Sequence, residues 1–208
     1  MNAIKIMVKG WVKVLPFYLF TLLPLFTSCG EETSEEEEFA NWKERNDLYL
    51  TALAEDSMQQ AGWQRFKKYS LDQNEEGAVS DYVYVKQIEK GEGTESPLFT
   101  DSVRVVYQGR LIPSKSYSKG YVFDGTVYGT YSSKTAYTNR QKVSNLIAGY
   151  TTALMHMHKG DYWRIYIPYE LGYGESGSGT KVPGYSVLIF DLTLLDISPI
   201  GEVMRPWR

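Results

Sequence analysis

Between residues 81 and 197 the chain is built from short alternating and apolar runs, and this pattern constrains the fold most. DYVYVKQI and DSVRVVYQGRL alternate apolar and polar residues, while YWRIYI and SVLIFDLTLLDI are rich in β-branched and aromatic residues. Gly, Pro and Ser turns bound these runs. Because successive side chains of a strand point to opposite faces of a sheet, the pattern predicts antiparallel strands with one apolar face.

One short helix is predicted among these strands, within AGYTTALMHMHKG. Tyr150, Ala153, Leu154 and Met157 fall on one helical face, and the segment ends in Lys-Gly, a common helix stop. We therefore predict an α+β fold, in which a curved antiparallel β-sheet wraps around one short α-helix. An N-terminal helical extension precedes this domain.

The extension is predicted from residues 35–58, which contain no Pro or Gly. Five residues share one helical face: Phe39, Trp42, Asn46, Tyr49 and Leu53. A face this aromatic is unfavourable in water, so we expect it to pack against the following domain or against its copy in a homodimer. Residues 59–80 are polar and mixed, and they are interpreted as a linker.

The first 29 residues have the features of an export signal. Three lysines precede the apolar run VLPFYLFTLLPLF, which is short and interrupted by Pro. The run ends in FTSCG, and Cys29 is the only cysteine of the chain, so the segment resembles the lipobox of bacterial lipoproteins. The resemblance implies cleavage before Cys29 and lipidation of its sulfur. An uncleaved anchor or a buried thiol are the alternatives.

Lipidation predicts a membrane partner and a place in the cell envelope. The protein would be lipid-anchored to the outer membrane, either periplasmic or surface-exposed. The GEETSEEEE block that follows repels itself and is interpreted as a tether. The predicted divisions are 1–28 signal peptide, 29–38 acidic tether, 39–79 helical extension and linker, 80–200 folded domain and 201–208 C-terminal tail.

Composition excludes several classes of function. With 43% hydrophobic residues the chain can form a globular core, and its net charge of −3 provides no general basic surface for nucleic acid. No Gly-x-Ser-x-Gly motif or phosphate-binding Gly loop is present. His156 and His158 are two apart and would point to different faces of a helix, so we predict a surface position and no metal site.

Four blocks of the sequence together resemble one known family. VRVVYQGRL, VFDGT, VSNLIAGYTTALMHMHKGDYWRIYIPYELGYG and VPGYSVLIFDLTLLDI follow one another in the order seen in FKBP-type peptidyl-prolyl cis-trans isomerases. The resemblance covers roughly residues 82–197, and the third block is most similar to the macrophage infectivity potentiator subgroup. It implies an enzyme that isomerises X-Pro bonds of exported proteins, takes no cofactor and binds proline-containing polypeptides.

The same resemblance implies the site residues. The catalytic set it implies is Tyr107, Phe123, Asp124, Ile147 and Tyr173, and the substrate-binding set is Leu146, Tyr150 and Phe190. Phe123 and Tyr107 would be aromatic walls, Asp124 a carboxylate beside them, and Tyr173 a hydroxyl donor. Ile147 would offer its backbone N–H to a carbonyl of the ligand.

Some positions depart from the family pattern. Tyr150 replaces a tryptophan at the pocket floor, and Gln141 or Asn139 replaces an aromatic wall. Ser178 and residues 182–184 alter the glycine-rich segment after Tyr173, which is interpreted as a mobile flap. IPSKSYSKGY is an insertion near the pocket mouth. These changes leave a second hypothesis open, namely a non-catalytic binding or chaperone module tethered to the membrane.

Overall fold

The computed structural model describes residues 37–206. In order, its helices and strands are α2 Trp42–Ser57, β1 Trp63–Lys67, β2 Tyr82–Glu89, β3 Ser102–Arg110, β4 Val122–Gly125, β5 Asn139–Lys142, α3 Ala148–Leu154, β6 Tyr162–Ile167 and β7 Leu188–Ser198. The predicted signal peptide, Cys29 and most of the acidic tether lie outside the described residues. Within the described part, no helix has the length and apolar character needed to span a bilayer.

The strands form one antiparallel sheet, as predicted. Its order is β1-β2-β6-β7-β3-β4, and β5 also pairs with β3. The first half of β3 pairs with β5 and its last residues pair with β4, so β3 carries two short partners on one edge. β7 pairs with β3 on one side and with β6 on the other, and it therefore lies in the centre of the sheet.

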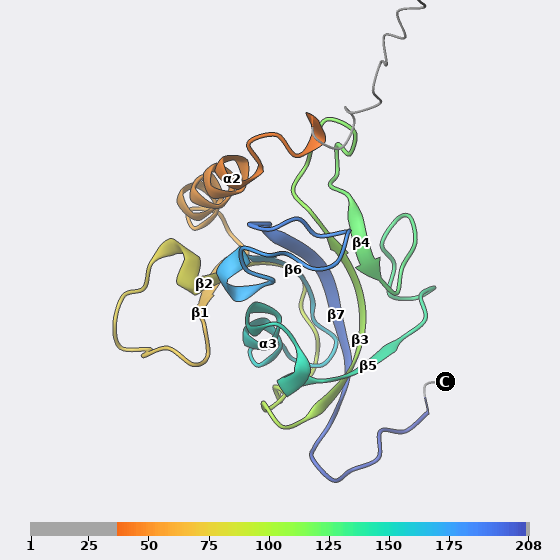
Figure 1. Ribbon diagram of the computed structural model, residues 1–208. Coiled ribbons are helices and arrows are strands. Elements are labelled where there is room, and N and C mark those ends of the chain that lie inside the picture. The colour runs from red at the N-terminus through yellow and green to blue at the C-terminus, as the bar shows by residue number, and fades with distance from the viewer. Residues whose placement is uncertain (1–36, 207–208) are drawn as a thin grey trace, which may run out of the picture.

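Helix α3 lies in the hollow of the curved sheet (Figure 1). Its predicted apolar face is buried, since Ala153 and Leu154 have no exposed surface. Met157 was predicted on the same helical face and is equally buried, but it lies after the helix, which ends at Leu154. Gly149 explains how close the helix comes to β6, because a Cβ at this position would lie 2.3 Å from the Ile167 side chain. The prediction of a sheet wrapped around one short helix is confirmed.

The N-terminal helix begins later than predicted. Residues 35–58 were expected to be helical, but α2 starts at Trp42 because Asn41 adopts a left-handed backbone conformation with a φ of 52°. Asn is one of the few residues that tolerate this conformation, so it can interrupt a helix without Gly or Pro. The chain before it turns back, and the Phe39 and Trp42 rings meet edge to face at 5.0 Å.

Helix α2 packs against its own domain, which is the first of the two expected arrangements. The Trp42 indole donates a hydrogen bond of 2.8 Å to Ser186 Oγ, and Val187 N–H donates one of 2.8 Å to Asn46 Oδ1. Tyr49 approaches Tyr166 of β6, with ring centroids 6.4 Å apart. Trp42 and Asn46 are buried by these contacts.

The interpretation of residues 59–80 as a linker is wrong in its first part. Residues 63–67 form strand β1, which pairs with β2 along its whole length. Phe66 stacks on Trp163 at 5.7 Å and on His156 at 4.1 Å, which supplies the apolar contact that holds this edge strand. The segment was missed because WQRFK is short and largely polar, so its alternation is weak.

Candidate active site

Four aromatic rings gather on the concave side of the sheet. Phe190 of β7 is central: it lies 5.1 Å from Tyr150 of α3, 5.6 Å from Phe123 of β4 and 6.3 Å from Tyr107 of β3. Tyr107 and Tyr150 are also edge to face, at 6.3 Å. Tilted and edge-to-face contacts at these distances are favourable for aromatic rings, so the cluster forms an apolar wall.

A glycine of β3 makes room for this cluster. A Cβ on Gly109 would lie 2.5 Å from the Phe190 ring and 2.8 Å from the Phe123 ring, closer than any side chain tolerates. The β3 backbone therefore serves as the surface on which both rings rest. This position explains how Phe123 and Phe190, which are on different strands, are brought together.

A carboxylate lies at the edge of the aromatic cluster. The Tyr107 hydroxyl donates a hydrogen bond of 2.8 Å to Asp124 Oδ2, and the Gly125 N–H donates one of 2.8 Å to Asp124 Oδ1. Burial raises the pKa of Tyr107, and its hydrogen bond to the Asp124 carboxylate raises it further. Tyr107 therefore remains a neutral donor that holds Asp124 in place.

A cavity of 360 Å³ opens between this edge and the glycine-rich segment after β6. Its lining includes Phe123, Asp124 and Tyr173 from the predicted site. The Tyr173 hydroxyl has no hydrogen-bond partner within the described residues, and burial raises the pKa of this hydroxyl, followed by the effect of the Asp124 charge. A neutral, unpaired hydroxyl can donate to a carbonyl group of a bound ligand.

Residues of the glycine-rich segment form the opposite wall. Ser178 and Val182 exchange two backbone hydrogen bonds, of 2.8 and 3.2 Å, and so close a small hairpin over the cavity. Thr180 and Lys181 at its tip also line the cavity, and the sequence interpretation did not name them. The sequence pointed to Thr180 and Lys181 only through their position in the glycine-rich segment that was interpreted as a mobile flap.

Leu146 and Ile147 lie immediately before α3, and both are half-buried against the core. Ile147 is the residue that precedes the first turn, and its carbonyl accepts a hydrogen bond from the Thr151 N–H. Within the described residues, its own N–H has no acceptor. This is consistent with the role of a backbone donor to a ligand, although neither residue lines the 360 Å³ cavity.

The predicted site residues thus fall into three groups. Phe123, Asp124 and Tyr173 line the cavity, and Leu146 and Ile147 precede α3. The rings of Tyr107, Tyr150 and Phe190 form the buried cluster that Phe123 connects to the cavity. Tyr150 is 3% exposed and its hydroxyl is buried, so its polar tip does not line an open pocket floor.

The two histidines lie after α3 and do not converge. One face of the His156 ring is stacked on Phe66 at 4.1 Å, while the residue is otherwise exposed, and burial lowers the pKa of its imidazole. His158 Nδ1 lies 3.7 Å from Asp161 Oδ2. In the described part of the chain, no three His, Cys, Asp or Glu side chains are grouped as metal ligands would be.

Known protein families include one whose sequence pattern covers this group of residues. The sequence pattern of FKBP-type peptidyl-prolyl cis-trans isomerases matches residues 93–195, from before β3 to within β7. This chain belongs to the FKBP-type family. The matched range includes every residue of the predicted site, and it begins after α2, β1 and β2.

Among curated relatives, the Macrophage infectivity potentiator of Trypanosoma cruzi is 29% identical over 89% of this chain and 80% of that protein. The FKBP-type 22 kDa peptidyl-prolyl cis-trans isomerase of Escherichia coli is 36% identical over 63% of this chain. This match spans only 55% of the E. coli protein. The resemblance to the macrophage infectivity potentiator subgroup is thus supported.

Solved structures agree on the fold. The crystal structure of FkpA from Escherichia coli superposes with a TM-score of 0.56 at 25% identity, covering 76% of this chain and 62% of that one. A peptidyl-prolyl cis-trans isomerase from Pseudomonas syringae gives a TM-score of 0.53 at 22% identity, with 75% and 96% covered. The FKBP-like architecture with its N-terminal helix is therefore established.

Proposed function

We propose that this protein catalyses cis-trans isomerisation of X-Pro peptide bonds in exported polypeptides. The observation that carries the proposal is the Phe123, Tyr107, Tyr150 and Phe190 cluster, which adjoins a cavity holding Asp124 and the unpaired Tyr173 hydroxyl. Membership of the FKBP-type family supports the same activity.

The reaction breaks no covalent bond, so the site needs no nucleophile. The barrier, about 20 kcal/mol, comes from amide resonance that is lost as the C–N bond twists. An apolar pocket that binds the proline ring removes water from the planar amide and favours the less polar twisted state. The aromatic walls would supply this environment in the present chain.

Hydrogen bonds would then hold the residues on either side of the twisting bond. Tyr173 O–H and Ile147 N–H are donors without partners in the described residues, so each can bind a substrate carbonyl. Asp124, fixed by Tyr107, would place negative charge beside the amide. These contacts accelerate rotation only to the extent that they fit the twisted geometry better than the planar one.

The test is the rate of cis-to-trans exchange of a Leu-Pro or Phe-Pro peptide. Phe123→Ala is expected to lower kcat/KM about tenfold or more, equivalent to at least about 1.4 kcal/mol of transition-state stabilisation. Tyr173→Phe should lose a smaller factor, about threefold to fivefold, and Asp124→Asn should lie between the two. Circular dichroism of each variant checks that the fold is retained.

Matched controls come from an aromatic pair outside the cavity. Tyr69 and Phe99 have ring centroids 5.3 Å apart and are partly exposed. Tyr69→Phe and Phe99→Ala make the same chemical changes and should leave the rate within about twofold. A wild-type protein that binds proline peptides without accelerating exchange would establish the binding-module alternative. Full activity of Phe123→Ala would refute the pocket assignment.

The membrane attachment is a separate proposal. It is supported by the lone Cys29 after an apolar run, and both lie outside the described residues. Lipidation of Cys29 would place the protein at the outer membrane, with the acidic segment as a tether. Cys29→Ser should release the protein to the soluble fraction or block its processing, and unchanged membrane partition would contradict the proposal.

A homodimer through the N-terminal helix remains a prediction. The aromatic face of α2 is already covered by its own domain, so a dimer would have to use another face, on which Leu48 is 64% exposed. Light scattering of the chain with and without residues 1–57 distinguishes the two cases. A mass equal to that of its own monomer in each sample would exclude a dimer built on α2.

A further inference from the structure

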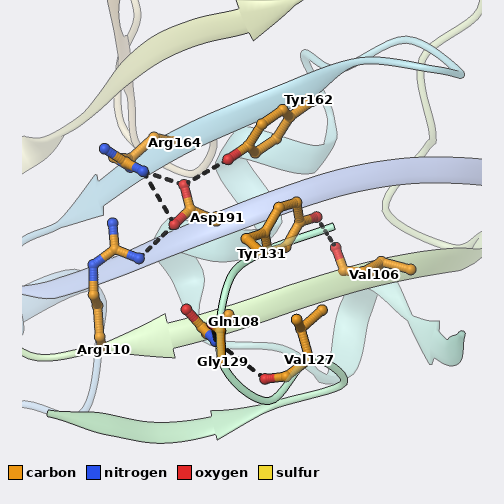
Figure 2. A network of polar contacts seen from close by, with 9 residues as sticks. All are labelled: Val106, Gln108, Arg110, Val127, Gly129, Tyr131, Tyr162, Arg164 and Asp191. Carbon is orange, nitrogen blue, oxygen red and sulfur yellow. Dashed lines mark hydrogen bonds and ion pairs between the residues drawn. The ribbon is translucent and has the colours of Figure 1, made fainter. Parts of the chain in front are cut away.

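A second cleft lies on the opposite face of the sheet from α3. Gln108 of β3, Asp191 of β7 and Arg164 of β6 are direct cross-strand neighbours, so their side chains form one row. The alternate residues Ile165, Leu192 and Trp163 point to the buried core. The row therefore forms the floor of an outer cleft that has no part in the proposed proline site (Figure 2).

The Asp191 carboxylate lies at the centre of this floor, and both of its oxygens accept hydrogen bonds from neighbouring side chains. Its Oδ1 accepts hydrogen bonds from Arg164 Nε at 2.8 Å and from the Tyr162 hydroxyl at 3.2 Å. Its Oδ2 accepts from Arg110 Nη1 and, at 3.3 Å, from Arg164 Nη2. A carboxylate offers about four acceptor positions, so Asp191 has none left for a further cation.

The cleft therefore carries an excess of positive charge. Its charged lining consists of Arg110, Arg164 and Lys119 against the single carboxylate of Asp191. Within the described residues Arg110 makes one hydrogen bond, to Asp191, although a guanidinium has several N–H donors and this side chain is only 12% exposed. Unneutralised charge in a partly buried position favours an anionic ligand.

Two tyrosines from outside the central strands, Tyr131 and Tyr49 of α2, also line the cleft. Tyr131 is fixed by hydrogen bonds of 2.9 Å to Val106 O and 2.8 Å to Thr193, and it stacks on Tyr162 at 4.8 Å. Burial raises the pKa of Tyr49 and of Tyr162 to about 12, so both hydroxyls stay neutral at physiological pH.

The size of the cleft also limits the kind of ligand. Its volume is 780 Å³, within the range of sites that bury small organic molecules or short peptide segments. Tyrosines offer both apolar ring surface and hydroxyl groups, a combination typical of polypeptide-binding surfaces. A simple inorganic anion would occupy only a small part of this volume.

We propose that this outer cleft is a second binding site, which takes an acidic segment of another polypeptide. Carboxylates of the segment would pair with Arg110, Arg164 and Lys119, and the tyrosines would contact its backbone and apolar side chains. The proposal goes beyond the isomerase activity and does not depend on it. It would let the protein hold an acidic stretch of a polypeptide on the face opposite the proline site.

The test is isothermal titration of the full chain with a short, proline-free peptide rich in Glu and Tyr, and with the same peptide carrying Gln in place of Glu. We expect only the acidic peptide to bind.

Arg164→Gln should weaken binding of the acidic peptide about tenfold, because Arg164 lies in the floor of the cleft. Lys119→Gln should weaken it about threefold, because Lys119 lies at the exposed rim. Phe123→Ala should leave this binding unchanged.

Arg140→Gln is the matched control, because it removes an equal charge from exposed strand β5, away from the cleft. Equal weakening by Arg140→Gln, equal binding of the Gln peptide, or displacement by the same concentration of inorganic phosphate would each overturn the proposal. It would also be overturned if the peptide bound only after Glu31, Glu32, Glu35 and Glu36 were replaced by Gln, since the occupant would then be this chain's own segment. The proposal would also be overturned if the acidic peptide bound neither to the wild-type protein nor to the protein with these four Glu replaced by Gln.

Discussion

Tyr150 is the residue at which this chain departs most clearly from the family pattern. It lies between Tyr107 and Phe190, is 3% exposed and has a hydroxyl without a partner among the described residues. The ring keeps the aromatic contacts expected of a pocket floor, while the buried hydroxyl loses its hydrogen bonds to water. Burial accordingly raises the pKa of Tyr150.

Replacing this hydroxyl by hydrogen should therefore stabilise the protein. Tyr150→Phe is expected to raise the free energy of unfolding by about 1 kcal/mol, because it removes an unpaired polar group and keeps the ring. Tyr84 is the control: it is equally buried, but its hydroxyl donates a 3.0 Å hydrogen bond to Val79 O. Tyr84→Phe should lower stability by a similar amount in urea unfolding. Destabilisation by Tyr150→Phe would show that its hydroxyl is paired in solution.

At the scale of elements, α2 and β1 connect the extension to the domain that defines the family. Asn46 is fully buried in α2, donates a 2.7 Å hydrogen bond to Trp42 O and accepts one from the Val187 N–H. Val187 directly precedes β7 and follows the glycine-rich segment over the cavity. The helix is thus attached to the chain segment that leads from the candidate site into the centre of the sheet.

Asn46→Ala should be costly, because it leaves a buried backbone N–H without an acceptor. We expect a loss of about 2 kcal/mol in the free energy of unfolding. Thr51→Ala is a matched control, since Thr51 also bonds a helix carbonyl, that of Asp47, but is exposed. It should change stability by less than about 0.5 kcal/mol. Equal effects of the two substitutions would mean that the α2 contact is not maintained in solution.

The stability contributed by the stacking of His156, after α3, on Phe66 of β1 should depend on pH. Burial against Phe66 lowers the pKa of His156 below the value of about 6.5 expected when unfolded. The unfolded state then binds more protons, so the stability due to neutral His156 is present above pH 6.5 and is lost as pH falls below it. His156→Asn should reduce the fall in melting temperature between pH 7 and 5. An unchanged slope in His156→Asn would contradict this assignment.

For the molecule as a whole, the boundary of the folded domain lies before residue 80. Strand β1 covers β2 from Tyr82 to Lys86 and adds the ring of Phe66 to the core. The family pattern begins only at residue 93, yet β2 pairs with both β1 and β6. The sheet therefore includes residues that the predicted division at residue 80 assigned to a linker.

Shortened chains should reveal this boundary. Residues 58–208 retain β1, whereas residues 80–208 lack it, and we expect the shorter fragment to be less stable by about 2 kcal/mol or more, from the lost Phe66 burial and ladder hydrogen bonds. Urea unfolding followed by tryptophan fluorescence measures the difference. Phe66→Ala in the longer fragment should reproduce much of it. Equal stability of the two fragments would place β1 outside the cooperative unit.

The sequence alone determined the parts of this protein that depend on local periodicity. Strands β2, β3, β6 and β7 and the buried face of α3 follow from apolar spacing, because burial of one face is a local property of a strand or helix. The order of the four blocks identified the family and, through it, Phe123, Asp124 and Tyr173, which line one cavity. The short strands β1 and β5 were not predicted, since WQRFK and NRQK contain too few apolar residues.

Only the tertiary structure decided which distant residues meet. Arg110 and Asp191 are 81 positions apart, and they pair because β3 and β7 are neighbours in a particular register. A shift of one residue would move Asp191 to the core face and abolish the outer cleft. Likewise, the tertiary structure shows that α2 covers its own domain, where Asn46 accepts a hydrogen bond from the Val187 N–H. Periodicity specifies which face of an element is apolar, but strand order and register decide what lies opposite it.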